Sequence, residues 1–139
     1  MKENRYIYPA IFSYDPDGIS VEFPDLPGCF TSGDTQEEAL EMAKEAMALH
    51  LFGLEEDNDV IPVASSLKVV KTQANQATVL VDVWMPPFRQ EMNNQSVKKT
   101  LTIPHWLEKK ASEYNVNYSH LLQEALKKHL DANEPDPHI

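Results

Sequence analysis

The pattern of apolar and polar residues in the first third of the chain contains three short runs that are typical of strands. In the second run every other residue from Ile19 to Phe23 is apolar, which is the pattern of a half-buried strand. Two turn-forming segments, Asp15–Gly18 and Pro24–Gly28, separate the runs, because Pro presets φ and Gly accepts a positive φ. Pro9 in the first run indicates an edge position or a bulge. The pattern predicts an antiparallel three-stranded meander over Tyr6–Tyr14, Ile19–Phe23 and Cys29–Thr31.

A helical pattern follows these three runs. Thr35 is followed three residues later by Glu38, which is the capping box of a helix N-terminus. We therefore expect an amphipathic helix from about Thr35 to Leu51, laid on the sheet, with Gly53 as its C-terminal stop. Its apolar stripe consists of Leu40, Ala43, Met47 and Leu51.

Two more runs lie beyond the predicted helix. Leu67–Lys71 is compatible with a short strand, and Ala77–Met85 is nearly continuously apolar, as expected for a strand covered on both faces. Pro86 and Pro87 end this strand, and the polar segment Phe88–Ser96 predicts a linker. The N-terminal part is thus an α+β unit with the element order βββα(β)β.

The C-terminal third combines one alternating run with two helical patterns. Lys98–Ile103 alternates and stops at Pro104, and the two helical patterns that follow are separated by Asn115–Asn117. One strand and two short helices cannot close a core alone, since about three strands, or a strand packed on helices, are needed for independent stability. This part of the chain therefore predicts pairing with a second copy.

The strand and its two helices resemble the ribbon-helix-helix domain of bacterial repressors such as Arc and MetJ. In that domain two chains pair their strands into a ribbon that lies in the DNA major groove. Leu101 and Ile103 share one strand face, which must point to the helices because side chains alternate along a strand. Lys99 has the same parity and is expected to snorkel or to contact phosphate. The other face carries the expected base-reading residues, Lys98, Thr100 and Thr102.

The start of the second C-terminal helix is an expected phosphate site, because free N–H groups and the positive dipole end meet there. Asn117 is the expected N-cap, and Tyr118 and Ser119 follow it, matching the phosphate-clamping turn of the ribbon-helix-helix family. Two alternatives stay open. In the first, residues 98–103 form an ordinary dimerising strand with a polar outer face. In the second, the ribbon-helix-helix unit forms but only dimerises and does not bind DNA.

Charge is distributed unevenly along the chain. The net formal charge is −10, which taken as a whole argues against nucleic acid as a partner. Residues 1–90 contain 6 Lys and Arg against 15 Asp and Glu, a charge of −9, whereas residues 98–130 contain 6 Lys against 3 Glu, a charge of +3. This asymmetry predicts two kinds of partner, unless the acidity serves only solubility.

Composition narrows the class of protein further. With 42% apolar and 24% charged residues the chain has the composition of a globular protein without a disorder signature. The single cysteine, Cys29, excludes an internal disulfide and fits a reducing compartment. We find no apolar run of about 18 residues and no signal-peptide pattern at the N-terminus. A cytoplasmic protein is expected.

Several turn and cap motifs occur in a fixed order in the N-terminal part, namely Tyr8-Pro9-Ala10, Gly18-Ile19, Phe23–Cys29, Gly33-Asp34-Thr35 and Glu38-Ala39. This series resembles the HicB antitoxin family, closely from Tyr8 to about Pro62 and more loosely over the last strand. The resemblance implies a degraded ribonuclease-H-like fold and binding of a small HicA toxin. It also implies a C-terminal DNA-binding domain, which is helix-turn-helix in some members and ribbon-helix-helix in others.

We therefore expect an α+β protein in four parts: a HicB-like toxin-binding domain (1–86), a linker (87–96), a ribbon-helix-helix domain for DNA binding and dimerisation (97–132), and a tail (133–139). Its expected function is that of a type II antitoxin that neutralises a HicA-like RNA-cleaving toxin and, as a homodimer or higher oligomer, represses its own operon. The alternative is a stand-alone transcriptional regulator whose N-terminal domain senses a ligand or multimerises. The expected toxin contacts are Glu22, Asp25, Leu26, Glu37, Glu41 and Glu45.

Catalysis is not expected. A ribonuclease-H-like enzyme needs several carboxylates converging on two metal ions, and the candidates are Asp15, Asp17, Glu22, Asp25 and Asp82. Three of these lie in turns, where Asp is favoured for backbone reasons, and Asp82 alone does not hold two metals. Cys29 has no neighbouring histidine to activate it, and the 5 histidines lack metal-motif spacing. We expect no catalytic residue, no metal site and no cofactor.

Overall fold

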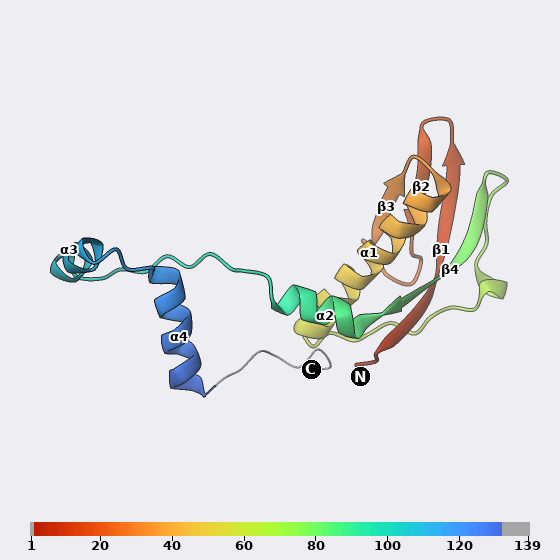
Figure 1. Cartoon of the computed structure of the whole chain (residues 1–139). Helices are drawn as coiled ribbons and strands as arrows, with labels where there is room; N and C mark the ends of the chain where they lie inside the picture. The colour runs from red at the N-terminus through yellow and green to blue at the C-terminus, as the bar shows by residue number, and fades with distance from the viewer. Residues whose placement is uncertain (1, 132–139) are drawn as a thin grey trace.

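The computed structural model describes residues 2–131, which form an α+β body and a separate C-terminal arm (Figure 1). The body is an antiparallel sheet in the order β3-β2-β1-β4, with α1 laid along one face. Its elements are β1 (Arg5–Asp15), β2 (Gly18–Glu22), β3 (Phe30–Gly33), α1 (Gln36–Glu56), β4 (Gln76–Trp84) and α2 (Met85–Asn93). The arm comprises residues 95–131, with α3 (His105–Glu113) and α4 (Tyr118–Leu130). The predicted tail, 133–139, lies outside the described residues.

The meander predicted for β1, β2 and β3 is confirmed. The turn at 15–18 joins β1 to β2, so that Asp15 pairs with Gly18 and Ile11 with Glu22. The edge position predicted from Pro9 is wrong for the strand as a whole, because β1 is central and Pro9 pairs with Leu80 of β4. Pairing with β2 begins only at Ile11. Pro9 therefore has a neighbouring strand, β4, on one side only. On the other side no strand is paired with it, so its missing N–H costs no ladder hydrogen bond there.

The predicted cap of α1 is confirmed, and its predicted end is not. Thr35 Oγ1 accepts a hydrogen bond from the Glu38 backbone N–H at 3.1 Å, as an N-cap does. The Glu38 carboxylate reaches back to the Asp34 N–H at 3.3 Å, one residue earlier than the standard capping box. The helix passes through Gly53 and ends at Glu56, since the apolar stripe continues beyond the glycine.

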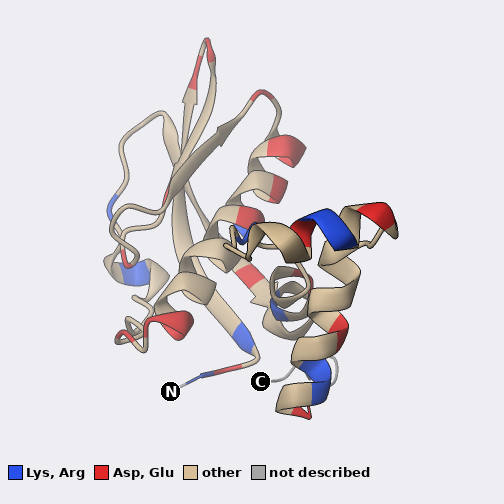
Figure 2. Cartoon of the chain, turned by 90° about the vertical axis from the view of Figure 1, so that its left-hand side faces the viewer, with Lys and Arg blue, Asp and Glu red and all other residues tan. Residues whose placement is uncertain are grey.

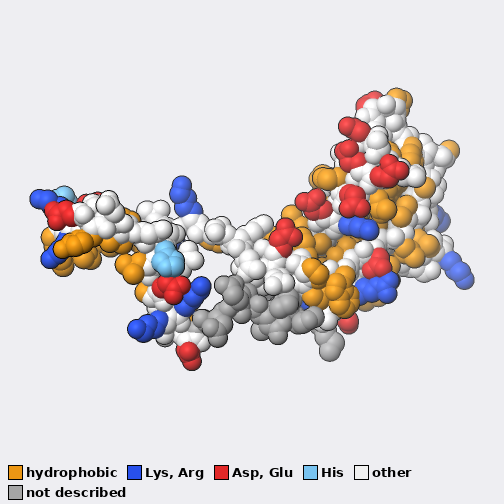
Figure 3. Space-filling model, in the orientation of Figure 1, with side chains coloured by type: hydrophobic (Ala, Val, Ile, Leu, Met, Phe, Trp, Pro, Cys, Tyr) orange, Lys and Arg blue, Asp and Glu red, His pale blue; other side chains and the backbone are white. Residues whose placement is uncertain are grey.

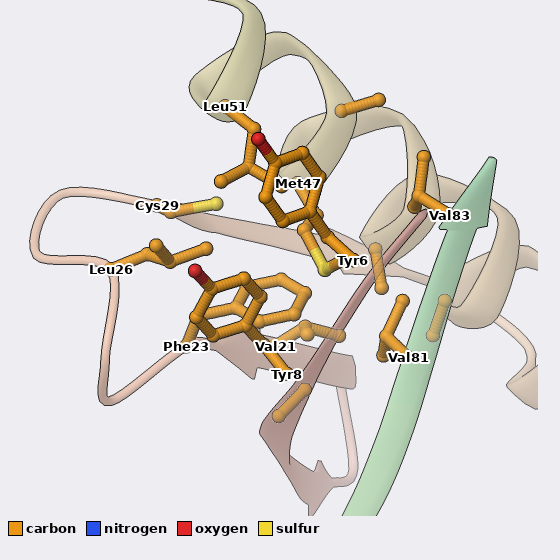
Figure 4. Packing of buried hydrophobic residues seen from close by; sticks show 14 of the residues in the cluster. Tyr6, Tyr8, Val21, Phe23, Leu26, Cys29, Met47, Leu51, Val81 and Val83 are labelled. Carbon is orange, nitrogen blue, oxygen red and sulfur yellow. The ribbon is translucent and has the colours of Figure 1, made fainter. Parts of the chain in front are cut away.

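One hydrophobic core fills the space between α1 and the sheet (Figure 4). The turn after β2 closes one end of this core with Leu26 and Cys29, which are 0% and 5% exposed. Burial raises the pKa of the Cys29 thiol to about 11, so it stays protonated at neutral pH. The strands contribute Tyr6, Tyr8, Phe12, Val21, Val81 and Val83, and α1 contributes Ala43, Met47 and Leu51.

Two predictions for the segment after α1 are wrong. Residues 67–69 form a short 3-10 helix rather than a strand. The strand β4 is buried on the α1 face alone, because Leu80 and Trp84 on its other face are 52% and 56% exposed. The run looked continuously apolar because large side chains occupy both faces, although only one face is covered.

The predicted linker at 87–96 is also corrected, because Met85–Asn93 forms α2. Arg89 of α2 is buried, with its side chain 1% exposed, and it makes a bidentate ion pair with Glu55 at 3.0 and 2.8 Å. Its other donors reach Asn4 Oδ1 at 2.9 Å and the Glu3 carbonyl. Tyr6 donates its hydroxyl to the same Glu55 carboxylate at 2.9 Å. This Arg89 cluster fastens α2 to the end of α1 and to the start of the chain.

The arm stands away from the body on an extended segment (Figure 1). Its helices are those predicted, and Asn117 caps α4 by accepting a hydrogen bond from the His120 N–H at 3.0 Å. Between them the chain turns at Asn115, whose φ is 53°. None of the helices within residues 2–131 is long and apolar enough to cross a membrane.

Candidate binding surfaces

The exposed side of α1 is acidic. Glu37, Glu41 and Glu45 recur at four-residue spacing and are all exposed, so they form one line along the helix (Figure 2). Lys44, three residues after Glu41 and seven after Glu37, lies beside this line, and its charge adds to the Arg5 hydrogen bond in lowering the pKa of Asp82. The structure thus brings three of the predicted toxin contacts together on one surface.

An apolar stripe runs beside these acidic residues and was missed at the sequence level. Met42, Ala46, Leu49 and Gly53 follow one another at spacings of four, three and four residues, which places them on one flank of the helix. Met42 is 37% and Leu49 53% exposed. A Cβ added to Gly53 would meet no atom within 4 Å, so this end of the stripe is open. We name these four residues the α1 stripe.

The turn at 24–28 does not offer the contacts predicted for it. Leu26 is fully buried, because the turn folds over the end of the core, so its assignment as a toxin contact is wrong. Asp25 accepts hydrogen bonds from the Ser65 backbone N–H at 2.9 Å and from the Ser65 hydroxyl at 2.6 Å. Its carboxylate thereby fixes the segment after α1 to the turn, and both oxygens are already used within the chain.

Glu22 lies on a different surface from the acidic line of α1. It is exposed on the sheet face opposite the helix, where it pairs across from Phe30, which is 73% exposed. Both residues border a shallow groove of about 670 Å³ that also includes Ser20 and Ile11. The sheet separates this groove from α1, so one small partner lying flat on α1 does not also cover Glu22.

The residues predicted to read DNA lie in the extended segment before α3. Lys98, Lys99, Thr100 and Thr102 are all exposed, and residues 96–104 contain no helix or strand. A β-strand is held by hydrogen bonds to a neighbouring strand, and the neighbour predicted for this segment is a second chain. The residues meant to face the helices are exposed too, with Leu101 at 56%.

Apolar side chains remain uncovered along both arm helices (Figure 3). These residues match the predicted helix faces, and none of them is buried in the single chain. Monomeric soluble proteins rarely expose extended apolar patches, so this surface of the arm is a candidate binding surface. The large members of this surface are Leu107, Tyr114, Leu121, Leu126 and Leu130, between 41% and 75% exposed.

Some polar groups at the start of α4 already have partners within the chain. Asn117 uses its side-chain oxygen as the cap, and the Tyr118 hydroxyl lies 3.5 Å from both the Glu108 carbonyl and the Ser112 hydroxyl. Tyr118 therefore joins α3 to α4 rather than pointing freely away from them. Ser119 is exposed, as a phosphate contact requires.

The carboxylates weighed as metal ligands do not converge. Within residues 2–131 no three His, Cys, Asp or Glu side chains gather in a way that could hold a metal ion. Asp82 is exposed and forms an ion pair with Arg5, whose Nε lies 2.9 Å from its Oδ1. Asp15 accepts a hydrogen bond from Asn75 at 3.2 Å.

One known family matches a range of this chain that includes both the body and most of the arm. The sequence pattern of the HicB-like antitoxins of bacterial toxin–antitoxin systems matches residues 8–126, a range that runs from β1 well into α4. The chain belongs to this family. It is a family of antitoxins and not of enzymes.

Individual relatives agree with this membership over the body. A protein of Haemophilus phage HP1 is 36% identical over 77 residues, which are 55% of this chain and 58% of the phage protein. Antitoxin HicB 2 of Photorhabdus laumondii is 44% identical over 59 residues, 42% of each chain. Antitoxin HicB of Escherichia coli K12 is 39% identical over 61 residues, 43% of this chain and 44% of that one. The chain thus spans about half the length of the curated relatives it matches.

Two solved structures resemble the whole chain. A toxin–antitoxin complex from Streptococcus pneumoniae contains a chain with a TM-score of 0.61 and 26% identity, covering 90% of this chain and 99% of that one. The antitoxin HicB of Burkholderia pseudomallei has a TM-score of 0.52 at 22% identity and covers 90% and 98%, which shows likeness of fold. The mixed α+β architecture with a small antiparallel sheet is common to them.

Proposed function

We propose that this chain is the antitoxin of a type II system in which the body binds and neutralises a small HicA-like RNA-cleaving toxin while the arm represses the operon by binding its operator. The observation that carries the proposal is the family match over residues 8–126, because it joins an antitoxin body to this arm in one pattern. The similar chain in the Streptococcus pneumoniae toxin–antitoxin complex supports a toxin partner. Both RNA and operator DNA lie in the cytoplasm, so the proposal places the chain there.

The body fits a toxin that binds RNA. Residues 1–90 have a formal charge of −9, and a protein that holds RNA presents basic side chains to the phosphates. Opposite charges speed association and favour the correct pairing. In the proposed assignment the body is a ribonuclease-H-like fold reduced to one sheet and its helices, and it keeps no carboxylate cluster among its described residues. Its role is to cover the toxin.

The arm fits a ribbon-helix-helix dimer. A second copy would pair its strand with residues 98–103 and cover the apolar faces of α3 and α4, which the single chain leaves exposed. Lys98, Thr100 and Thr102 would then point into the major groove, with Lys99 and the start of α4 near phosphates. We place the toxin-binding part at residues 2–94, since α2 belongs to the body, and the DNA-binding part at 97–131.

The toxin partner is tested by co-expression. A short reading frame beside the gene for this chain, encoding a basic protein of toxin size, is expressed together with the tagged chain. We expect the two proteins to co-purify, and we expect RNA cleavage by the small protein to stop in the complex. A stand-alone regulator predicts that no such protein co-purifies.

Operator binding is tested at the ribbon. Replacing Lys98 or Thr102 with Ala removes a predicted base contact, and we expect operator binding to weaken by about 1–3 kcal/mol in each case, with toxin binding unchanged. Fluorescence anisotropy at fixed salt, with DNA from upstream of the gene, measures the effect. Lys71→Ala and Thr72→Ala are matched controls, because both residues are exposed in the body. Unchanged operator affinity in the ribbon variants contradicts the assignment.

A further inference from the structure

The α1 stripe is an apolar surface with an acidic border on one side. Glu38 precedes Met42 by four residues, and Glu45 precedes Leu49 by four, so each glutamate lies next to an apolar member of the stripe. Both glutamates are exposed. Protein interfaces combine an apolar centre, poor in charged residues, with a polar border that stays accessible to water. The α1 stripe and its two glutamates have this arrangement over the part of α1 between Glu38 and Gly53.

The helix geometry separates this flank from other charges on α1. Glu37 lies five residues before Met42, about 140° around the helix axis. Lys44 lies two residues after Met42, about 160° away from it and on the same side of the helix as Glu37, and its charge acts on Asp82 of β4. The border of the α1 stripe is therefore acidic without a basic residue of α1 beside it. A partner that fits this flank has an apolar patch surrounded by basic side chains.

The packing of the body leaves three of the four stripe residues, Met42, Leu49 and Gly53, exposed, whereas Ala46 is partly buried. The helix α2 meets α1 beside the end of the stripe, where Phe52, three residues after Leu49, makes an edge-on ring contact with Phe88 at 6.1 Å and Glu55 is held by Arg89. On the stripe side Leu49 stays 53% exposed, and Gly53 leaves room for a side chain from outside. The contact with α2 thus covers Phe52 in part and leaves Leu49 exposed, so the chain itself does not fill this part of the stripe.

We propose that the α1 stripe, Met42, Ala46, Leu49 and Gly53, with Glu38 and Glu45 at its border, is the docking surface for the basic toxin. The inference rests on the proposed function, and it assigns different roles to acidic residues of the same helix. Glu45 makes contact with the bound toxin. Glu37, at the end of the acidic line farthest from the stripe, only adds to the electrostatic field that attracts the toxin. Residues that act through the field change the association rate and its salt dependence rather than the dissociation rate.

Two matched pairs of variants test the assignment, with the basic protein that co-purifies with the chain as the probe. Leu49→Lys places a charge in the stripe, and Leu80→Lys places the same charge at a residue of nearly equal exposure, 53% against 52%, on the sheet face opposite α1. Both variants change the net charge equally, so long-range attraction changes alike. We expect Leu49→Lys to raise the dissociation constant by about tenfold or more relative to Leu80→Lys, as loss of a central contact does.

The second pair removes one charge beside the stripe and one charge away from it. Glu45→Gln is expected to raise the dissociation rate, and Glu37→Gln to lower only the association rate, with an effect that fades at high salt. Biolayer interferometry at two salt concentrations measures both rates. Circular dichroism melting curves show whether each variant is folded. If Leu49→Lys does not fold, the glutamate pair decides, since both residues are exposed.

Each outcome has a distinct meaning. If no basic protein co-purifies with the unchanged chain, the proposed function fails and the docking surface with it. If the toxin binds, and Leu49→Lys and Leu80→Lys bind it equally, only the docking surface is overturned. If Leu49→Lys splits an assembly of the free chain by light scattering and leaves toxin affinity unchanged, the stripe is a contact between copies, and the proposal is overturned in favour of that contact.

Discussion

Replacing Arg89 with Met should lower the free energy of unfolding of the body by about 3–5 kcal/mol, because it leaves the Glu55 carboxylate buried without its partner. Both side chains are almost fully buried, at 1% and 3% exposure, and Arg89 also bonds Asn4 and the Glu3 carbonyl. Urea unfolding followed by circular dichroism measures the loss. The effect is large because a buried charge without its partner is removed from water with no compensating interaction.

A double variant provides the control for this experiment. Arg89→Met with Glu55→Gln removes both charges, and the glutamine can still accept the hydrogen bond from Tyr6. We expect the double variant to be more stable than Arg89→Met alone, since no charge is left buried. A loss below about 1 kcal/mol in the single variant is typical of exposed ion pairs, and it would show that the Arg89 cluster does not hold α2 in place.

Replacing Gly33 with Ala should destabilise the body by about 3 kcal/mol, at the upper end of overpacking effects. A Cβ at this position would lie 2.5 Å from the Ala39 backbone nitrogen and 2.8 Å from its Cα. These are backbone atoms of the first turn of α1, so relief requires the helix to move away from β3. Close approach, and not an unusual φ, is the reason for glycine here.

Gly53 is the matched control, because it is a glycine of α1 with free space around it. No atom lies within 4 Å of a Cβ built there, and alanine is favoured over glycine inside a helix by roughly 0.5–1 kcal/mol. Gly53→Ala should therefore raise the urea midpoint while Gly33→Ala lowers it. Shifts of the same sign in both variants contradict the close approach of β3 and α1.

The parts of the fold that follow from neighbouring residues were predictable from the sequence. The Asp15–Gly18 turn fixes the register of β1 and β2, and Thr35 and Asn117 cap α1 and α4 as their residue types indicate. These features depend on interactions within a few residues along the chain. The same local chemistry predicted where the arm helices begin.

The helix α2 could not be recognised in this way. Pro86 and Pro87 mark the end of β4, but they also fit the first turn of a helix, where the missing N–H is not needed. Arg89 looks like a surface residue of a polar linker until Glu55, 34 residues earlier in the chain, is seen beside it. Burial of a charged side chain depends on such a distant partner, so a short sequence pattern cannot predict it.

The candidate surfaces show the same difference between features set by neighbouring residues and features set by tertiary packing. Spacing alone placed Glu37, Glu41 and Glu45 on one exposed line of α1. Leu26 was misplaced because a turn residue was taken to be exposed, whereas this turn folds inward over the core. Met42 and Leu49 escaped notice because the inward stripe already accounted for the amphipathic pattern, and only the tertiary packing shows that a second apolar flank has no cover.

Because α2 is anchored to the body, it limits the length of the linker between the body and the arm. Only residues 95–104 separate the cap of α2 from α3, and ten extended residues reach at most about 35 Å. That distance is close to one turn of B-DNA, about 34 Å. With the arm seated in a groove, each body and the toxin it carries would stay within roughly one turn of the operator. Under the proposed function, toxin held there would crowd the adjoining DNA, so that the amount of free toxin and access to the promoter would be linked by distance alone.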